Sequence, residues 1–147
     1  MLVRQATLQD LPRLSACGRE FYTSSKVLRE FNIERFCETW TVLLSNGTGV
    51  IFLLCDGEEI TGTIGGMAHK DLYSNDIIGQ EFFWYVLEES RGAGVRLYRA
   101  FENWAKERGC SRLRMGYLVD SMPEKVGRFY ERLGLEADEV VYSKELK

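Results

Sequence analysis

The run Phe82-Phe83-Trp84-Tyr85-Val86 constrains the fold more than any other stretch of this sequence. A strand with one face in water alternates apolar and polar residues, whereas this segment, which we predict as a strand over residues 80–87, is apolar on both faces. Such a strand has to be covered on both sides. It therefore predicts a sheet with helices packed against both faces, and 147 residues are enough for one such domain.

The rest of the sequence alternates between strand and helix signals. Asp10 follows Thr7 at the spacing of a capping box, Asn32 precedes a second apolar helical pattern, and Asp56-Gly57 is typical of a tight hairpin turn. We expect strands at about 3–6, 50–55, 60–67, 80–87, 112–118 and 139–146, and helices at about 8–22, 33–45, 95–108 and 122–133.

A further short strand at 135–137 is left open. Tight hairpins occur here together with a β-α-β crossover, and this combination indicates an α/β domain with a mixed, mostly antiparallel sheet. Residues 1–147 are expected to form this single domain, with helices on both faces of the sheet.

Composition excludes several classes of function. The 19 basic and 22 acidic residues give a net charge of −3, which argues against binding to nucleic acid or to an anionic membrane. No apolar run approaches the roughly 20 residues of a membrane span, and the N-terminus lacks a signal-peptide pattern, so we expect a cytoplasmic protein. A single histidine, His69, and four isolated cysteines predict no structural zinc site: Cys17, Cys37, Cys55 and Cys110. No sequence motif indicates a site for another metal, although a magnesium site made of carboxylates stays open.

A glycine-rich turn connects the apolar strand to a long amphipathic helix. Gly92 and Gly94 would let a ligand approach the backbone, and the first amides of the helix are donors at its positive end. Arg91 and Arg96 add positive charge, so the turn is suited to phosphate or pyrophosphate. A dinucleotide fingerprint fails, because Leu97 stands where its third glycine would be. A glycine turn before a helix is more often only a turn, and this signal alone leaves both interpretations open.

Three segments, in the right order, resemble a known family. The stretch 91–96, Arg-Gly-Ala-Gly-Val-Arg, is similar to the Q/R-x-x-G-x-G/A acyl-CoA pyrophosphate loop of GNAT-type N-acetyltransferases. Residues 129–135, Phe-Tyr-Glu-Arg-Leu-Gly-Leu, look like the FYxxxGF segment of that family, and residues 3–12 resemble its opening strand and helix. The order of elements matches as well, so the resemblance covers nearly the whole chain.

The resemblance implies an enzyme that moves an acetyl group from acetyl-CoA directly to a primary amine, without a metal or an acyl-enzyme. It also implies that backbone amides at the end of the apolar strand bind the pantetheine and the thioester oxygen. Carried over to this sequence, the cofactor-binding residues are Trp84, Val86 and Leu87 on the strand and Arg91, Gly92, Ala93, Gly94, Val95 and Arg96 on the loop.

Three residues depart from the family pattern. Glu88 replaces the proline that often follows the strand. Arg96 stands where the family prefers glycine or alanine, and its side chain could crowd the phosphates. Pro123 stands where the family often has an asparagine that touches the cofactor.

The resemblance makes Tyr130 the acid that protonates the departing thiolate. Without it, Tyr130 would be read as a core residue beside Val126, Phe129 and Leu133. The general base is less determined. Glu81, just upstream of the acetyl position, is the first choice, and the alternatives are solvent and three other carboxylates: Glu88, Glu89 and Asp120.

The acceptor stays open at this point, between an amine-bearing small molecule and a protein or peptide amine. A homodimer is common in such folds and is a further open alternative. Two other classes of function compete with the enzyme: a non-catalytic acyl-CoA-binding module and a regulatory, partner-binding module of the same fold. Release of free thiol from acetyl-CoA in the presence of amines distinguishes the enzyme from both.

Overall fold

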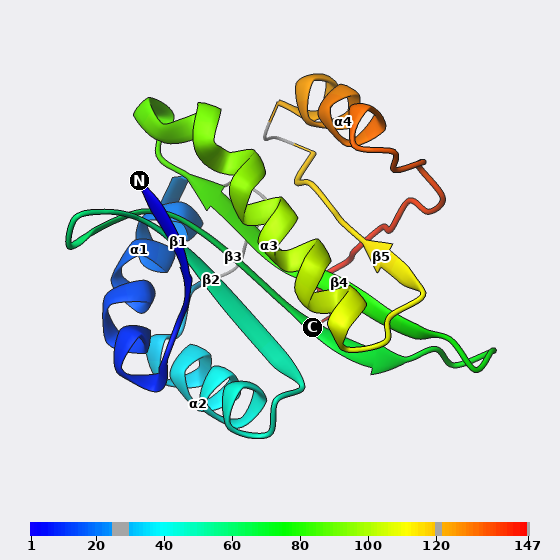
Figure 1. Ribbon diagram of the computed structural model, residues 1–147, viewed down its shortest axis with the longest axis horizontal. Coiled ribbons are helices and arrows are strands. Elements are labelled where there is room, and N and C mark those ends of the chain that lie inside the picture. The colour runs from blue at the N-terminus through cyan, green and yellow to red at the C-terminus, as the bar shows by residue number, and fades with distance from the viewer. Residues whose placement is uncertain (25–29, 120–121, 147) are drawn as a thin grey trace. The chain divides into compact units, whose positions relative to one another are not determined.

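The computed structural model describes residues 1–24, 30–119 and 122–146. The chain divides into two compact units, Met1–Gly116 and Tyr117–Lys147. The first unit contains a five-stranded sheet in the order β1-β2-β3-β4-β5 (Figure 1). Its strands are β1 (Leu2–Gln5), β2 (Gly49–Asp56), β3 (Glu59–Lys70), β4 (Ile77–Val86) and β5 (Arg112–Arg114). The first four strands pair antiparallel and β5 pairs parallel to β4, which confirms the mixed, mostly antiparallel sheet.

Helices cover both faces of this sheet, as the apolar strand predicts. The helices of the first unit are α1 (Leu11–Ser24), α2 (Ile33–Ser45) and α3 (Gly94–Glu107). Figure 1 shows α3 lying across one face, with α1 and α2 behind the other. Alternate residues of β2 serve the two sides: Ile51 and Leu53 pack in one core with Trp40 of α2, and Val50 and Leu54 pack in a second core with the α3 residues Leu97 and Phe101.

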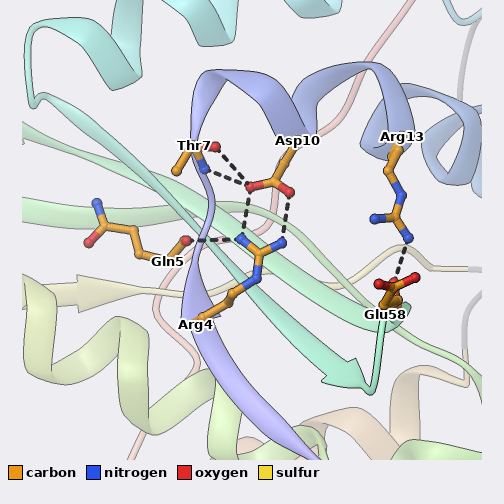
Figure 2. Close-up of polar contacts among 6 residues, drawn as sticks. All are labelled: Arg4, Gln5, Thr7, Asp10, Arg13 and Glu58. Atoms are coloured by element: carbon orange, nitrogen blue, oxygen red, sulfur yellow. Dashed lines mark hydrogen bonds and ion pairs between the residues drawn. The ribbon is translucent and has the colours of Figure 1, made fainter.

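The capping box predicted at the start of the first helix is confirmed (Figure 2). The Thr7 amide donates to Asp10 Oδ2 at 2.8 Å, and the residues Leu8–Asp10 form a short 3-10 turn, η1, before α1. Arg4 of β1 adds a bidentate ion pair to the same carboxylate, at 2.8 and 2.7 Å. The hydrogen bonds from Arg4 and Thr7 hold the pKa of Asp10 well below its ordinary value. Asp10 therefore fastens the first strand to the helix that follows it.

Other local signals also produce the predicted structure. Asn32 caps α2 by accepting a hydrogen bond from the Arg35 amide at 2.9 Å. Gly57 has a φ of 62° in the turn between β2 and β3, and Arg13 of α1 donates to the Glu58 carbonyl of that turn at 2.6 Å (Figure 2). Gly109 ends α3 with a φ of 79°.

The second unit contains one helix, α4 (Pro123–Arg132), among its described residues. Pro123 occupies the first turn of α4, and Gly134 follows the helix with a φ of 88°. Met122 precedes the helix in the left-handed region, at φ 46°, and its side chain makes no capping bond.

Two expected strands are wrong or shortened. β5 ends at Arg114 rather than at residue 118, and the strand expected at 139–146 is absent. The short strand left open at 135–137 is absent as well. A strand needs a neighbour for its backbone hydrogen bonds, and β5 pairs with β4 over three residues only. The apolar residues that suggested the last strand are exposed: Val140, Val141, Tyr142 and Leu146. Apolar alternation alone therefore overestimated the strand content of the C-terminal part.

Candidate active site

β5 is shorter than β4, so it pairs with only part of one edge of β4. The last pair between the two strands is Gln80 with Arg114, while β4 continues to Val86. In the part of the chain that the structure describes, no other strand pairs with this edge. The two strands thus part next to Glu81, and the remaining length of β4 presents its backbone at the gap.

The hydrogen bonds to β3 decide which β4 amides face this edge. The Leu87 amide donates to the Thr61 carbonyl at 2.9 Å. In an antiparallel ladder, every second residue points its backbone groups at the partner strand. Tyr85, opposite Thr63, therefore faces β3, and the amides of Trp84 and Val86 point toward the edge that β5 leaves. Leu87, the third amide predicted for the cofactor, is instead bound within the sheet.

The side chains of Trp84 and Val86 have a different role from their backbone. The Trp84 ring lies 6.2 Å from that of Tyr98 on α3, and both Trp84 and Val86 join the core under this helix. Their side chains are therefore held by packing while their amides point to the edge of the sheet.

A β-bulge interrupts β4 just before these residues. Gly65 of β3 lies opposite Phe83, but the next residue, Gly66, lies opposite Glu81, so Phe82 is an extra residue in β4. The two glycines make this possible. A Cβ on Gly65 would lie 2.3 Å from the Phe83 ring, and a Cβ on Gly66 would lie 2.4 Å from the Gln80 carbonyl oxygen. Sequence reasoning missed this bulge, although consecutive glycines inside a strand are its usual signal.

Glu81 lies at the point where the two strands part. Its carboxylate accepts a hydrogen bond from the Gly116 amide, with Oε2 at 3.0 Å. Burial disfavours the charged form and raises the pKa of Glu81 from 4.5 to about 7, and the bond from Gly116 offsets only part of this effect. Its proton is therefore gained and lost near neutral pH, as a general base requires.

The alternative bases have other surroundings. Glu88 and Glu89 are exposed to solvent in the turn after β4, and Asp120 lies outside the described residues.

In the second unit, Tyr130 of α4 is buried, and its ring centroid lies 6.3 Å from that of Tyr117. Tyr117 lies in the part of the predicted strand 112–118 that is not a strand in the structure, so this contact was not expected from the sequence.

The glycine-rich turn is more regular than the sequence suggested. The residues Glu88–Ala93 form a 3-10 helix, η2, that leads directly into α3. The Ser90 amide donates to the Leu87 carbonyl at 2.9 Å, and the Gly94 amide donates to the Arg91 carbonyl. Gly94 has an ordinary φ of −59°. The turn therefore uses its amides internally, and conformational freedom is not the reason for this glycine.

Close packing explains Gly94, and open space surrounds Gly92. A Cβ on Gly94 would lie 3.2 Å from Val86 Cγ2, so the glycine lets the start of α3 approach β4. A Cβ on Gly92 would meet no atom within 4 Å. Arg91 is exposed beside it, whereas Arg96 turns to the N-terminus and donates to the Met1 carbonyl at 2.8 Å. Arg96 is thus held by the N-terminal residue that precedes β1 rather than directed over the turn.

Comparison of the sequence with protein families gives a match to the Acetyltransferase (GNAT) family over residues 14–135. The chain belongs to this family. A search of the curated proteins found no match for this GNAT sequence. Among the residues that the structure describes, no helix is long and apolar enough to cross a membrane, and no three metal-binding side chains are grouped for an ion.

Solved structures share the fold of this GNAT chain. An acetyltransferase of Trypanosoma brucei matches with a TM-score of 0.76 at 18% identity, over 99% of each chain. The glucosamine-6-phosphate N-acetyltransferase of Arabidopsis thaliana matches with a TM-score of 0.74 at 19% identity, over 99% of this chain and 98% of its own. A transcriptional regulator from Bacillus halodurans matches with a TM-score of 0.77 at 21% identity, over 99% of each chain. At such low identities these matches support the fold alone.

Proposed function

We propose that this GNAT protein is an N-acetyltransferase that moves the acetyl group of acetyl-CoA directly to a primary amine. The observation that carries the proposal is the position of Glu81. Its carboxyl group, with a pKa raised to about 7, lies where β4 parts from β5, on the same strand as the edge-facing amides of Trp84 and Val86. A proton acceptor and two backbone donors on one strand segment are what amide formation from a thioester requires.

The cofactor is bound mainly by backbone in this proposal. The amides of Trp84 and Val86 donate to the pantetheine arm and the thioester oxygen. The pyrophosphate lies at the turn before α3, where the helix N-terminus is positive and the exposed Arg91 adds charge. The hydrogen bonds of a 3-10 turn have poor geometry, so phosphate oxygens can replace them. The open space around Gly92 leaves room for this approach.

The transfer then proceeds in one covalent sequence. The neutral amine nitrogen attacks the thioester carbonyl carbon, and a C–N bond forms as the carbonyl oxygen becomes an oxyanion held by the strand amides. Glu81 takes a proton from the nitrogen, directly or through water, and solvent receives it afterwards. The C–S bond breaks, its electron pair leaves with sulfur, and Tyr130 protonates the thiolate to give free CoA. Solvent then returns a proton to the Tyr130 phenolate.

Release of free thiol from acetyl-CoA with a panel of primary amines tests this proposal. We expect amine-dependent release that increases with pH through about 7, because the Glu81 carboxylate is the reactive form. Glu81→Gln and Tyr130→Phe should each lower kcat by a factor on the order of 10²–10⁴ with little change in the affinity for acetyl-CoA. Glu89→Gln, a change at an exposed carboxylate of the turn, is the matched control.

Two results would contradict the proposal in different ways. If acetyl-CoA binds but no amine in the panel releases thiol, the chain is an acyl-CoA-binding module. If turnover occurs and Glu81→Gln leaves both its rate and its pH profile unchanged, solvent or another carboxylate is the base.

A further inference from the structure

The first three of the four consecutive aromatic residues of β4 have different surroundings. Phe83 packs against Trp40 of α2 at a ring distance of 5.3 Å, and Trp84 packs against Tyr98 of α3. Phe82 belongs to neither contact, and 53% of its surface is exposed to solvent. Phe83 and Trp84 therefore pack into the two cores on opposite faces of the sheet, whereas Phe82 packs into neither core.

The bulge determines how Phe82 is displayed. As the extra residue of β4, Phe82 is released from the regular alternation between the two faces of the sheet. Gly65 and Gly66 allow this bulge, since a Cβ on either would collide with β4 or α3. Bulges often redirect a side chain beside an active site. Here the redirected side chain immediately follows Glu81, whose carboxyl group lies where β4 and β5 part.

We propose that Phe82 selects the acceptor, and that the preferred acceptor is a primary amine carrying an aromatic or bulky apolar group a few bonds from its nitrogen. This inference rests on the proposed function, because it places the amine at Glu81. An apolar group on the amine then reaches the adjacent exposed ring and removes apolar surface from water.

Two amines that differ only by a ring test the inference. We expect kcat/KM for 3-phenylpropylamine to exceed that for propylamine by at least about tenfold in the native protein. Phe82→Ala should reduce this ratio to within about twofold while leaving kcat/KM for propylamine nearly unchanged, and Phe82→Leu should retain part of the preference. Tyr73→Ala is the matched control, since Tyr73 is a 93% exposed aromatic residue in the turn between β3 and β4.

The same panel includes spermidine and a lysine-containing peptide, which separates failure of this inference from failure of the proposed function. Faster turnover of spermidine or the peptide, or a ring preference that persists in Phe82→Ala, would overturn the role of Phe82 and leave the acetyltransferase intact. Absence of thiol release with every amine would overturn both.

Discussion

Glu81 links the stability of this protein to its chemistry. In the unfolded chain its carboxyl group titrates near its ordinary value of 4.5, and in the folded protein burial raises the pKa to about 7. Between these values the folded state keeps a proton that the unfolded state has released. Stability attributable to this residue is therefore complete below about pH 4.5, decreases as pH rises toward 7, and then stays low. A carboxylate that lowers stability at neutral pH is more easily explained by function than by folding.

Replacing Glu81 by glutamine should remove this pH dependence. A glutamine Oε1 can still accept the Gly116 hydrogen bond, and it carries no charge to desolvate. We expect Glu81→Gln to match the native protein near pH 4.5 and to exceed its free energy of unfolding above pH 7. The gain should reach at most about 3.5 kcal/mol, since each pKa unit corresponds to about 1.4 kcal/mol. Urea denaturation of both proteins across this pH range measures the difference.

The exposed Glu89→Gln serves as the control for that comparison, and its difference from the native protein should stay near zero throughout. A difference between Glu81→Gln and the native protein that is the same at every pH would mean that the Glu81 pKa is ordinary. Glu81 would then lose its advantage over the other carboxylates as the base.

At the scale of elements, the glycine in the turn η2 and the glycine at the start of α3 have different structural roles. Gly92 faces open space, and Gly94 is packed against Val86. Gly92→Asp should therefore leave the folded protein intact, while its negative charge weakens acetyl-CoA binding by about tenfold or more at the pyrophosphate. Gly92→Ala, which adds a Cβ without charge, should bind nearly as well as the native protein. Calorimetric titration with acetyl-CoA and thermal unfolding of each variant give the two readouts.

Gly94 provides the contrasting case. Gly94→Ala places a Cβ 3.2 Å from Val86 Cγ2, so it should lower the melting temperature before any ligand is added. If folded Gly92→Asp binds acetyl-CoA as tightly as the native protein, the pyrophosphate does not lie at this turn.

Elements with a strong local signal were predictable from the sequence. Some structures are determined by hydrogen bonds or backbone angles within a few neighbouring residues. They are the Thr7–Asp10 capping box, the Asn32 cap and the Asp56-Gly57 turn. The end of β5 and the absence of strands at 135–146 depend on pairing with a distant segment. Local alternation of apolar residues has no information about whether such a partner is present.

In the candidate site, too, some features were predictable from the sequence and others depend on the folded chain. The sequence indicated Glu81 and the amides of Trp84 and Val86 through the family resemblance, and the ladder with β3 gives those two amides the direction that was expected. The same ladder engages the Leu87 amide, which only the register can reveal. The raised pKa of Glu81 depends on burial and on the Gly116 amide, both of which require the folded chain.

At the scale of the whole molecule, the proposed acetyl-CoA site draws on β4, the turn η2 and α3, which form the same folded unit. A ligand that binds the folded chain and not the unfolded one stabilises it by mass action, by about 2.7 kcal/mol at a concentration 100 times its Kd. For a chain of this size that corresponds to a rise in Tm of roughly 5–10 °C.

Acetyl-CoA should therefore raise the Tm by this amount, and NAD and ATP at the same concentration should raise it much less. All three ligands carry a pyrophosphate that the positive end of α3 attracts, but only acetyl-CoA has a pantetheine arm that can reach the Trp84 and Val86 amides on β4. Free CoA, which keeps that arm, should behave like acetyl-CoA. Differential scanning fluorimetry with the four ligands makes the comparison. Equal shifts from all of them would reduce the site to a general anion site at the helix N-terminus, because the strand edge would then contribute nothing to binding.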